Sequence, residues 1–198
     1  MRTNYVLIDY ENVQPETLSE LAKDHVKVMV FVGANQTKVN FEVAASLQAM
    51  GDRAQYIKIS SSGPNALDFH IAFYIGMIAG RDPDAYFHII SKDTGFDPLI
   101  QHLKTRKVLA CRSKTINDMP MVKAANSKTP DERIEAVIAD LKRRGASRPR
   151  AIKTLTSTIA SIFQKKLSEQ EVSELIINLQ SKGFITLTEN KVAYSLPA

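Results

Sequence analysis

Two carboxylates in this 198-residue chain stand where apolar, strand-like segments end. Asp9 comes directly after Val-Leu-Ile, and Asp93 follows shortly after the apolar run that ends in Ile89 and Ile90. An ionised carboxylate at the end of a buried strand loses solvation unless a positive group meets it. A structural partner or a bound cation would each provide that group, so these two residues are the first candidates for chemistry.

Two further acids are candidates for the same place. Asp68 lies in the first turn of the helix predicted after Ser-Ser-Ser-Gly-Pro-Asn, and Asp97 directly precedes Pro98. Each has a structural alternative: Asn65 and Asp68 could form a helix cap, and Asp97 could be an ordinary N-cap before a proline.

Carboxylates that converge on one spot repel one another unless divalent cations neutralise them. Oxygen ligands without His or Cys favour Mg²⁺ or Mn²⁺. The predicted metal-binding and catalytic residues are Asp9, Asp68, Asp93 and Asp97.

These acids must be positioned by the elements around them, and the first part of the chain alternates between two patterns. Short runs rich in Val, Ile, Phe and Tyr predict strands over residues 5–8, 26–32, 54–59, 86–91 and 108–111. Helical spacing predicts helices over residues 15–24, 39–50, 66–79 and 98–106. Such alternation indicates an α/β fold with a parallel sheet covered by helices on both faces. Ligands bind at the carboxyl ends of such strands, so we expect the first and fourth strands to be neighbours that bring Asp9 and Asp93 together.

The pattern changes after a small, polar stretch over residues 124–129, which we interpret as a linker. Thr129 with Glu132, and Ser168 with Glu171, have the spacing of helix capping boxes. We expect helices over residues 130–144, 150–164 and 168–182, followed by two strands around Glu189. The predicted domains are residues 1–124 and a small winged helix over residues 130–198.

The net charge of +5 is concentrated in this second part, where no acid occurs from Lys142 to Lys166. Such a run suits a polyanion, although a solvated surface would look the same. The candidate substrate-binding residues of the run are Arg143, Arg144, Arg148, Arg150 and Lys153.

Several classes of protein are not expected. No apolar run is long enough to span a bilayer and the first residues lack a secretory pattern, so we predict a cytoplasmic protein with no membrane partner. The single Cys111 cannot form an internal disulfide, and the four His residues show no zinc spacing. The oligomeric state stays open, a homo-oligomer included.

Three motifs taken in order, VLIDYENV, NALDFHIAFYIG and IISKDTGFDPLI, resemble the acidic motifs of the PIN-like nucleases over roughly residues 3–120. The pair Asp9 and Asn12 is similar to that of the NYN branch. The resemblance implies a PIN-like (Rossmann-like) fold in which Asp9, Asp68 and Asp93 bind Mg²⁺ or Mn²⁺ and Asn12 helps to hold the site or the substrate. It also implies hydrolysis of phosphodiester bonds in RNA, usually single-stranded.

The third motif departs from the NYN pattern Ser-Gly-Asp-x-Asp-Phe. Lys92 replaces the Gly of this pattern, and Gly95 replaces its second Asp. Asp97, two positions later, is the candidate substitute for the missing acid, and Lys92 is a candidate for contact with a phosphate.

The sequence thus predicts a metal-dependent endoribonuclease with a C-terminal module that resembles LOTUS (OST-HTH) winged helices. Two alternatives remain. One is a PIN-like nucleic-acid-binding or regulatory protein that has lost cleavage. The other is a phosphatase of the haloacid dehalogenase type, because Asp-Tyr-Glu at residues 9–11 distantly resembles a nucleophilic Asp followed by a second acid.

Overall fold

The computed structural model describes residues 2–60, 62–127 and 129–197. Its chain forms two compact units, Met1–Met119 and Pro120–Ala198. No helix in the described part of the chain is long and apolar enough to cross a membrane.

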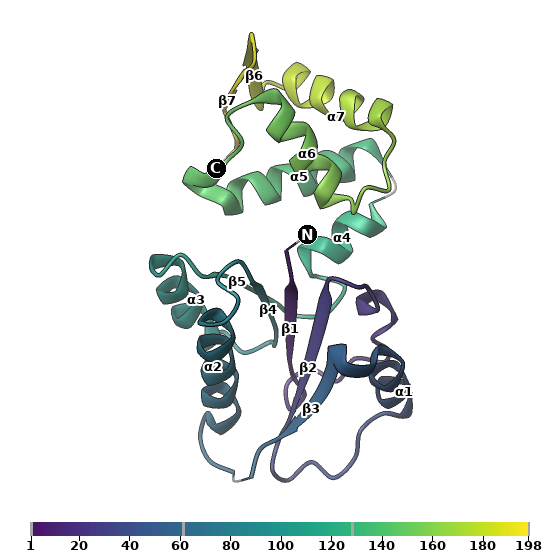
Figure 1. The fold of residues 1–198 in the computed structure, drawn as a ribbon, viewed down its shortest axis with the longest axis vertical. Helices are drawn as coiled ribbons and strands as arrows, with labels where there is room; N and C mark the ends of the chain where they lie inside the picture. The colour runs from purple at the N-terminus through teal and green to yellow at the C-terminus, as the bar shows by residue number, and fades with distance from the viewer. Residues whose placement is uncertain (1, 61, 128, 198) are drawn as a thin grey trace. The chain divides into compact units, whose positions relative to one another are not determined.

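The first unit is built on a five-stranded sheet with the order β3-β2-β1-β4-β5, in which all pairs are parallel (Figure 1). The strands are β1 (Asn4–Asp9), β2 (Val26–Val32), β3 (Ala54–Lys58), β4 (Tyr86–Ile90) and β5 (Leu109–Ser113). The expected α/β fold is confirmed, and so is the pairing of the first strand with the fourth, which sets Ile8 beside Ile90. The carboxyl ends of β1 and β4 therefore meet at one edge of the sheet.

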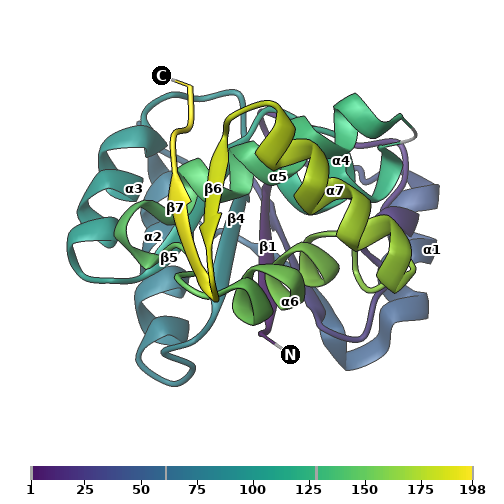
Figure 2. The same cartoon turned by 90° about the horizontal axis from the view of Figure 1, so that it is seen from above.

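Three helices cover this sheet: α1 (Phe41–Met50), α2 (Ala66–Ala79) and α3 (Phe96–Thr105). Figures 1 and 2 show α2 and α3 together on one side of the sheet and α1 on the other. Since side chains alternate along a strand, Leu7, Phe31 and Ile89 point to the α2 side, where they pack with Ile71 and Ile75. This core fixes the start of α2 relative to the strand ends.

The helix predicted over residues 15–24 is wrong. The segment contains only a short 3-10 turn, η1 (Ser19–Leu21), and a second such turn, η2 (Gly51–Arg53), precedes β3. Leu18 and Leu21 are both fully buried. Their three-residue spacing resembles a helical face, but one 3-10 turn is enough to bury both side chains.

The second unit contains α4 (Pro120–Asn126), α5 (Pro130–Arg144), the 3-10 turn η3 (Gly145–Ser147), α6 (Ile152–Ile162), α7 (Glu169–Ser181), and the strands β6 (Ile185–Thr188) and β7 (Lys191–Tyr194). Both capping boxes, Thr129 with Glu132 and Ser168 with Glu171, are confirmed. The strands β6 and β7 form an antiparallel hairpin, seen in Figure 2.

The linker predicted over residues 124–129 is corrected in its first half. Residues 124–126 complete α4, and Ala124 is buried in the core of the second unit with Leu141 and Leu155. The small, polar residues of the stretch are typical of a linker, but Ala124 among them makes an apolar contact with this core. Lys128 lies outside the described residues.

Candidate active site

Three of the predicted carboxylates lie at the carboxyl edge of the parallel sheet. Asp9 is the last residue of β1, Asp93 follows β4, and Asp68 lies in the first turn of α2. The adjacency of β1 and β4 explains the first two positions, and the packing of α2 on the sheet explains the third. This edge is where doubly wound sheets bind ligands.

Asp9 is almost completely buried, with 1% of its surface exposed. Its Oδ1 accepts a hydrogen bond from the backbone N–H of Asn12 (3.2 Å). Its Oδ2 accepts two more, from Asn12 Nδ2 (2.6 Å) and from the Ser91 hydroxyl (2.8 Å). These neutral donors compensate the carboxylate for lost water without cancelling its charge. Asn12 therefore fixes the carboxylate of Asp9 in position.

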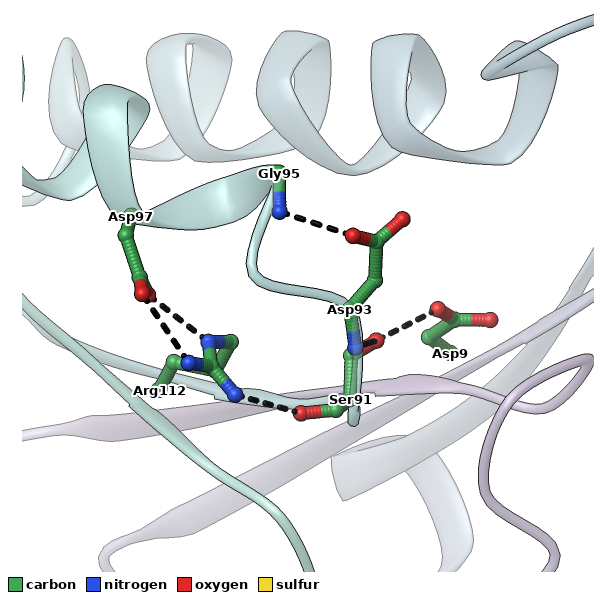
Figure 3. A network of polar contacts seen from close by, with 6 residues as sticks. All are labelled: Asp9, Ser91, Asp93, Gly95, Asp97 and Arg112. Carbon is green, nitrogen blue, oxygen red and sulfur yellow. Dashed lines mark hydrogen bonds and ion pairs between the residues drawn. The ribbon is translucent and has the colours of Figure 1, made fainter.

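Ser91, the residue after β4, connects the two strand ends. Its hydroxyl donates to Asp9 and accepts from the backbone N–H of Asp93 at 3.0 Å (Figure 3). Asp93 Oδ1 in turn accepts from the N–H of Gly95 at 2.7 Å. A Cβ added to Gly95 would lie 3.1 Å from that same oxygen, so the glycine allows a close turn. Both carboxylates are thus fixed by hydrogen bonds from neighbouring groups.

Asp68 is held differently, because no side-chain hydrogen bond to it is formed by the described residues. Burial, and after it the negative charges of Asp9, Asp93 and Glu11, raise the pKa of Asp68 from 3.8 to about 6. Helix capping does not explain this residue: Asn65 occupies the N-cap position with φ of 56° but makes no side-chain cap. Burial and the negative charges of its neighbours therefore both disfavour the ionised form of Asp68.

Glu11, which sequence reasoning left unassigned, is the fourth acid of this group. Its carboxylate lies against Gly33, just after β2: a Cβ on Gly33 would be 1.6 Å from Glu11 Oε1. Only glycine leaves this space to the side chain. The glycine after the second strand was the available signal, but a glycine there is also expected in any turn.

Asp97 is not brought into the cluster. Its two carboxylate oxygens accept from Nε (2.8 Å) and Nη2 (3.0 Å) of Arg112. This bond with Arg112 holds the pKa of Asp97 below its usual value. The N-cap alternative is also wrong, because Gly95 is the N-cap of α3 and Asp97 lies inside its first turn.

Arg112 and Ser91 form contacts around the carboxylates that sequence reasoning missed. Arg112 lies on β5, and its Nη1 donates to the carbonyl oxygen of Ser91 at 3.2 Å (Figure 3). It therefore ties Asp97 on α3 to the residue that orients Asp9. The strand was predicted to end at residue 111, which placed Arg112 outside the sheet.

The basic candidates differ in how available they are. Arg143 and Arg144, three and four residues after the buried Asp140, both form ion pairs with it. Arg148 Nε donates to the carbonyl oxygen of Leu141 at 2.8 Å.

The remaining three candidates, Lys92, Arg150 and Lys153, are exposed. The acid-free run from Lys142 to Lys166 therefore offers less unpaired positive charge than its sequence indicates, because Asp140, just before the run, pairs with two of its arginines.

The donor set fits a hard divalent cation. Within residues 2–60, 62–127 and 129–197, no three His, Cys, Asp or Glu side chains are gathered tightly enough to hold a metal ion by themselves. Mg²⁺ typically takes one or two carboxylates and completes its shell with water and substrate phosphate. Burial, and after it the charges of Asp9, Asp93 and Glu11, raise the pKa of Asp68, so these carboxylates interact electrostatically.

No curated protein and no solved structure matches the chain. One family model does, and it covers residues 3–113, which include the whole parallel sheet and every acid of the cluster. The chain therefore belongs to the PIN domain family, in its PIN7 branch.

Proposed function

We propose that this protein is a metal-dependent endoribonuclease that hydrolyses phosphodiester bonds in single-stranded RNA. PIN domains usually act as metal-dependent nucleases. The observation that carries the proposal is the convergence of Asp9, Asp68 and Asp93 at the carboxyl edge of the sheet, where burial and then the charges of Asp9, Asp93 and Glu11 raise the pKa of Asp68 to about 6. Perturbed titratable groups that cluster at such an edge are typical of functional sites.

Asp9, Asp68 and Asp93 would hold Mg²⁺ or Mn²⁺. A bound cation of this kind lowers the pKa of a water molecule and offsets charge that develops on phosphate oxygens. Asn12 and Ser91 keep the Asp9 carboxylate in place through three hydrogen bonds. Lys92, exposed beside Asp93, is the proposed contact for a substrate phosphate. We leave Asp97 out of the ligand set, because both its oxygens are engaged by Arg112.

The C-terminal unit is proposed to be a winged helix of the LOTUS (OST-HTH) kind that binds the RNA backbone. The order of α5, α6 and α7 before the hairpin of β6 and β7 supports this interpretation. Among the predicted basic residues, Arg150 and Lys153 are exposed, whereas Arg143 and Arg144 are paired with Asp140. Contacts from such residues would position the substrate without reading its sequence.

The test is cleavage of labelled single-stranded RNA with Mn²⁺ or with a chelator. Asp9→Asn and Asp93→Asn should each lower the Mn²⁺-dependent rate at least about a hundredfold, because each removes a negative ligand. Asp84→Asn, an exposed acid just before β4 at the opposite edge of the sheet, is the matched control and should cleave normally. Circular dichroism should show that all three variants are folded. Cleavage at the wild-type rate by both site variants would refute the nuclease.

A binding or regulatory protein without cleavage is the second candidate. The observation that favours it is the ion pair between Asp97 and Arg112. Gly95 stands where the NYN pattern has its second Asp, and because Asp97 is paired, it does not replace that acid. In that case Mn²⁺ would stabilise the protein while the RNA stayed intact. The phosphatase alternative has no support, because the chain is a PIN domain.

A further inference from the structure

A cavity of about 460 Å³ lies in the C-terminal unit, between the end of α5 and the strand β7. It belongs to a different unit from the acidic cluster. The lining residues that matter for its chemistry are Arg148, Arg150, Lys191, Val192 and Tyr194. Three of these five are cations, and no acid lines the cavity.

The aromatic wall of the cavity is fixed in position. The Tyr194 hydroxyl donates to the carbonyl oxygen of Pro149 at 2.6 Å. The guanidinium of Arg148 lies 5.7 Å from the centre of the Tyr194 ring and donates to the carbonyl oxygen of Leu141 at 2.8 Å. Ring and guanidinium therefore need little reordering when a ligand binds, which favours affinity.

The other two cations are brought together by backbone pairing. Ala151 forms an antiparallel bridge with Lys191, and the N–H of Val192 donates to the carbonyl oxygen of Arg150 at 3.0 Å. The side chains of Arg150 and Lys191 are exposed, and neither forms an ion pair with a described residue. Asp140, the nearest acid before this segment, is already held by Arg143 and Arg144. The mouth of the cavity is thus a site of uncompensated positive charge.

We propose that this cavity binds one nucleotide of a single-stranded nucleic acid. Arg150 and Lys191 contact its phosphate, and its base packs against the wall formed by Tyr194 and Val192. Aromatic side chains beside a positively charged groove are the usual platform for single strands, because every base has a face that can stack. A volume of 460 Å³ is in the range of small-ligand sites. A duplex keeps its bases paired and stacked, so it cannot fill the apolar part.

This proposal rests on the RNA-binding role given above to the C-terminal unit, and it names the place and the binding mode. It adds Lys191 and Tyr194, which lie beyond the acid-free run, and it reduces the importance of Arg143 and Arg144.

The experiment measures binding of the full-length protein to a labelled twelve-residue oligouridylate by fluorescence anisotropy. Chelator is present throughout, so cleavage plays no part. The double variant Arg150→Gln, Lys191→Gln should weaken binding at least about tenfold and lower the log–log salt slope by about 0.7, since the two side chains share one phosphate and each phosphate neutralised on a single strand contributes about 0.7. Lys165→Gln with Lys166→Gln changes the net charge equally outside the cavity and is the matched control, expected to alter affinity less than about twofold.

The aromatic wall is tested separately. Tyr194→Leu should weaken binding at least about fivefold with an unchanged salt slope, since stacking is not electrostatic. Tyr194→Phe keeps the ring and should bind nearly as wild type, and the melting temperatures of both variants show whether the unit stays folded. An RNA duplex of equal length should compete at least tenfold more weakly than the single strand.

Equal effects of the cavity variant and its charge-matched control would overturn the proposal, and so would equal competition by the duplex. Unchanged RNA affinity in the cavity variant would likewise overturn it. Because these measurements exclude metal, they are independent of the cleavage test: loss of cleavage in Asp9→Asn leaves them unaffected, and failure here leaves the nuclease site intact.

Discussion

Replacing Asp68 with Asn should stabilise the metal-free protein at neutral pH. The pKa of Asp68 is raised from 3.8 to about 6 in the folded state, first by burial and then by Asp9, Asp93 and Glu11. The folded protein therefore binds more protons than the unfolded chain between pH 4 and 6. Stability then falls as the pH rises through this range, and the full cost is present above about pH 6.

The magnitude follows from the size of the shift. About 2 pKa units correspond to about 3 kcal/mol, an upper limit that solvent screening reduces to about 1–2 kcal/mol for a half-exposed side chain. Against this, the substitution Asp68→Asn removes a favourable interaction of the carboxylate with the N-terminus of α2, worth about 0.3–1 kcal/mol. The penalty from burial and repulsion is the larger of the two effects, so Asp68→Asn should melt a few degrees higher than wild type.

The assay is thermal unfolding of wild type, Asp68→Asn and the control Asp84→Asn in chelator from pH 4 to pH 8. Wild type and Asp68→Asn should melt together near pH 4 and separate as the pH rises, while Asp84→Asn follows wild type throughout. With Mn²⁺ at a hundredfold excess over its dissociation constant, wild type should gain about 2.7 kcal/mol and Asp68→Asn clearly less. An Asp68→Asn protein that melts below wild type at pH 7.5, or gains as much from Mn²⁺, would refute the reasoning.

Two other substitutions test the surroundings of the cluster. Gly33→Ala places a Cβ where the Glu11 carboxylate now lies, so the flexible Glu11 side chain must move. We expect a small loss of stability. We also expect the pH-dependent difference in melting temperature between Gly33→Ala and the double variant Gly33→Ala, Asp68→Asn to be smaller than that between wild type and Asp68→Asn, as measured by the same melting series. Arg112→Gln removes the hydrogen-bond donor to the Ser91 carbonyl and the ion-pair partner of Asp97. It should lower the free energy of unfolding in urea by about 1–2 kcal/mol and leave the stabilisation by Mn²⁺ unchanged. Loss of the Mn²⁺ stabilisation would mean that Arg112 orders the metal site itself.

The strands of the sheet and the pairing of the first with the fourth were predictable, because mostly apolar runs alternate with helical segments. With Asp9 and Asp93 at the ends of their strands, only the pairing of β1 with β4 was needed to bring them to one edge. The capping boxes at Thr129 and Ser168 were equally predictable, since they depend on residues three positions apart. Local patterns sufficed wherever the determining contacts were themselves local.

The contacts that hold the site could not be read in this way. Ser91 touches Asp9 across 82 positions of the chain, and Arg112 reaches the carbonyl of Ser91 across 21. A serine after a strand and an arginine near the end of another have no distinctive spacing. The assignment of Asp97 failed for the same reason, because its partner is 15 residues away on the neighbouring strand β5.

The three carboxylates differ in how they are prepared for a cation. Asp9 receives three hydrogen bonds, and Asp93 is fixed by Gly95 and by its own N–H on Ser91. Their positions are therefore set before any ligand arrives. Asp68 has no such donor and carries the electrostatic cost of the cluster, which a divalent cation would remove. On the proposed function, binding of a cation would relieve the penalty that burial and the neighbouring charges place on the ionised form of Asp68.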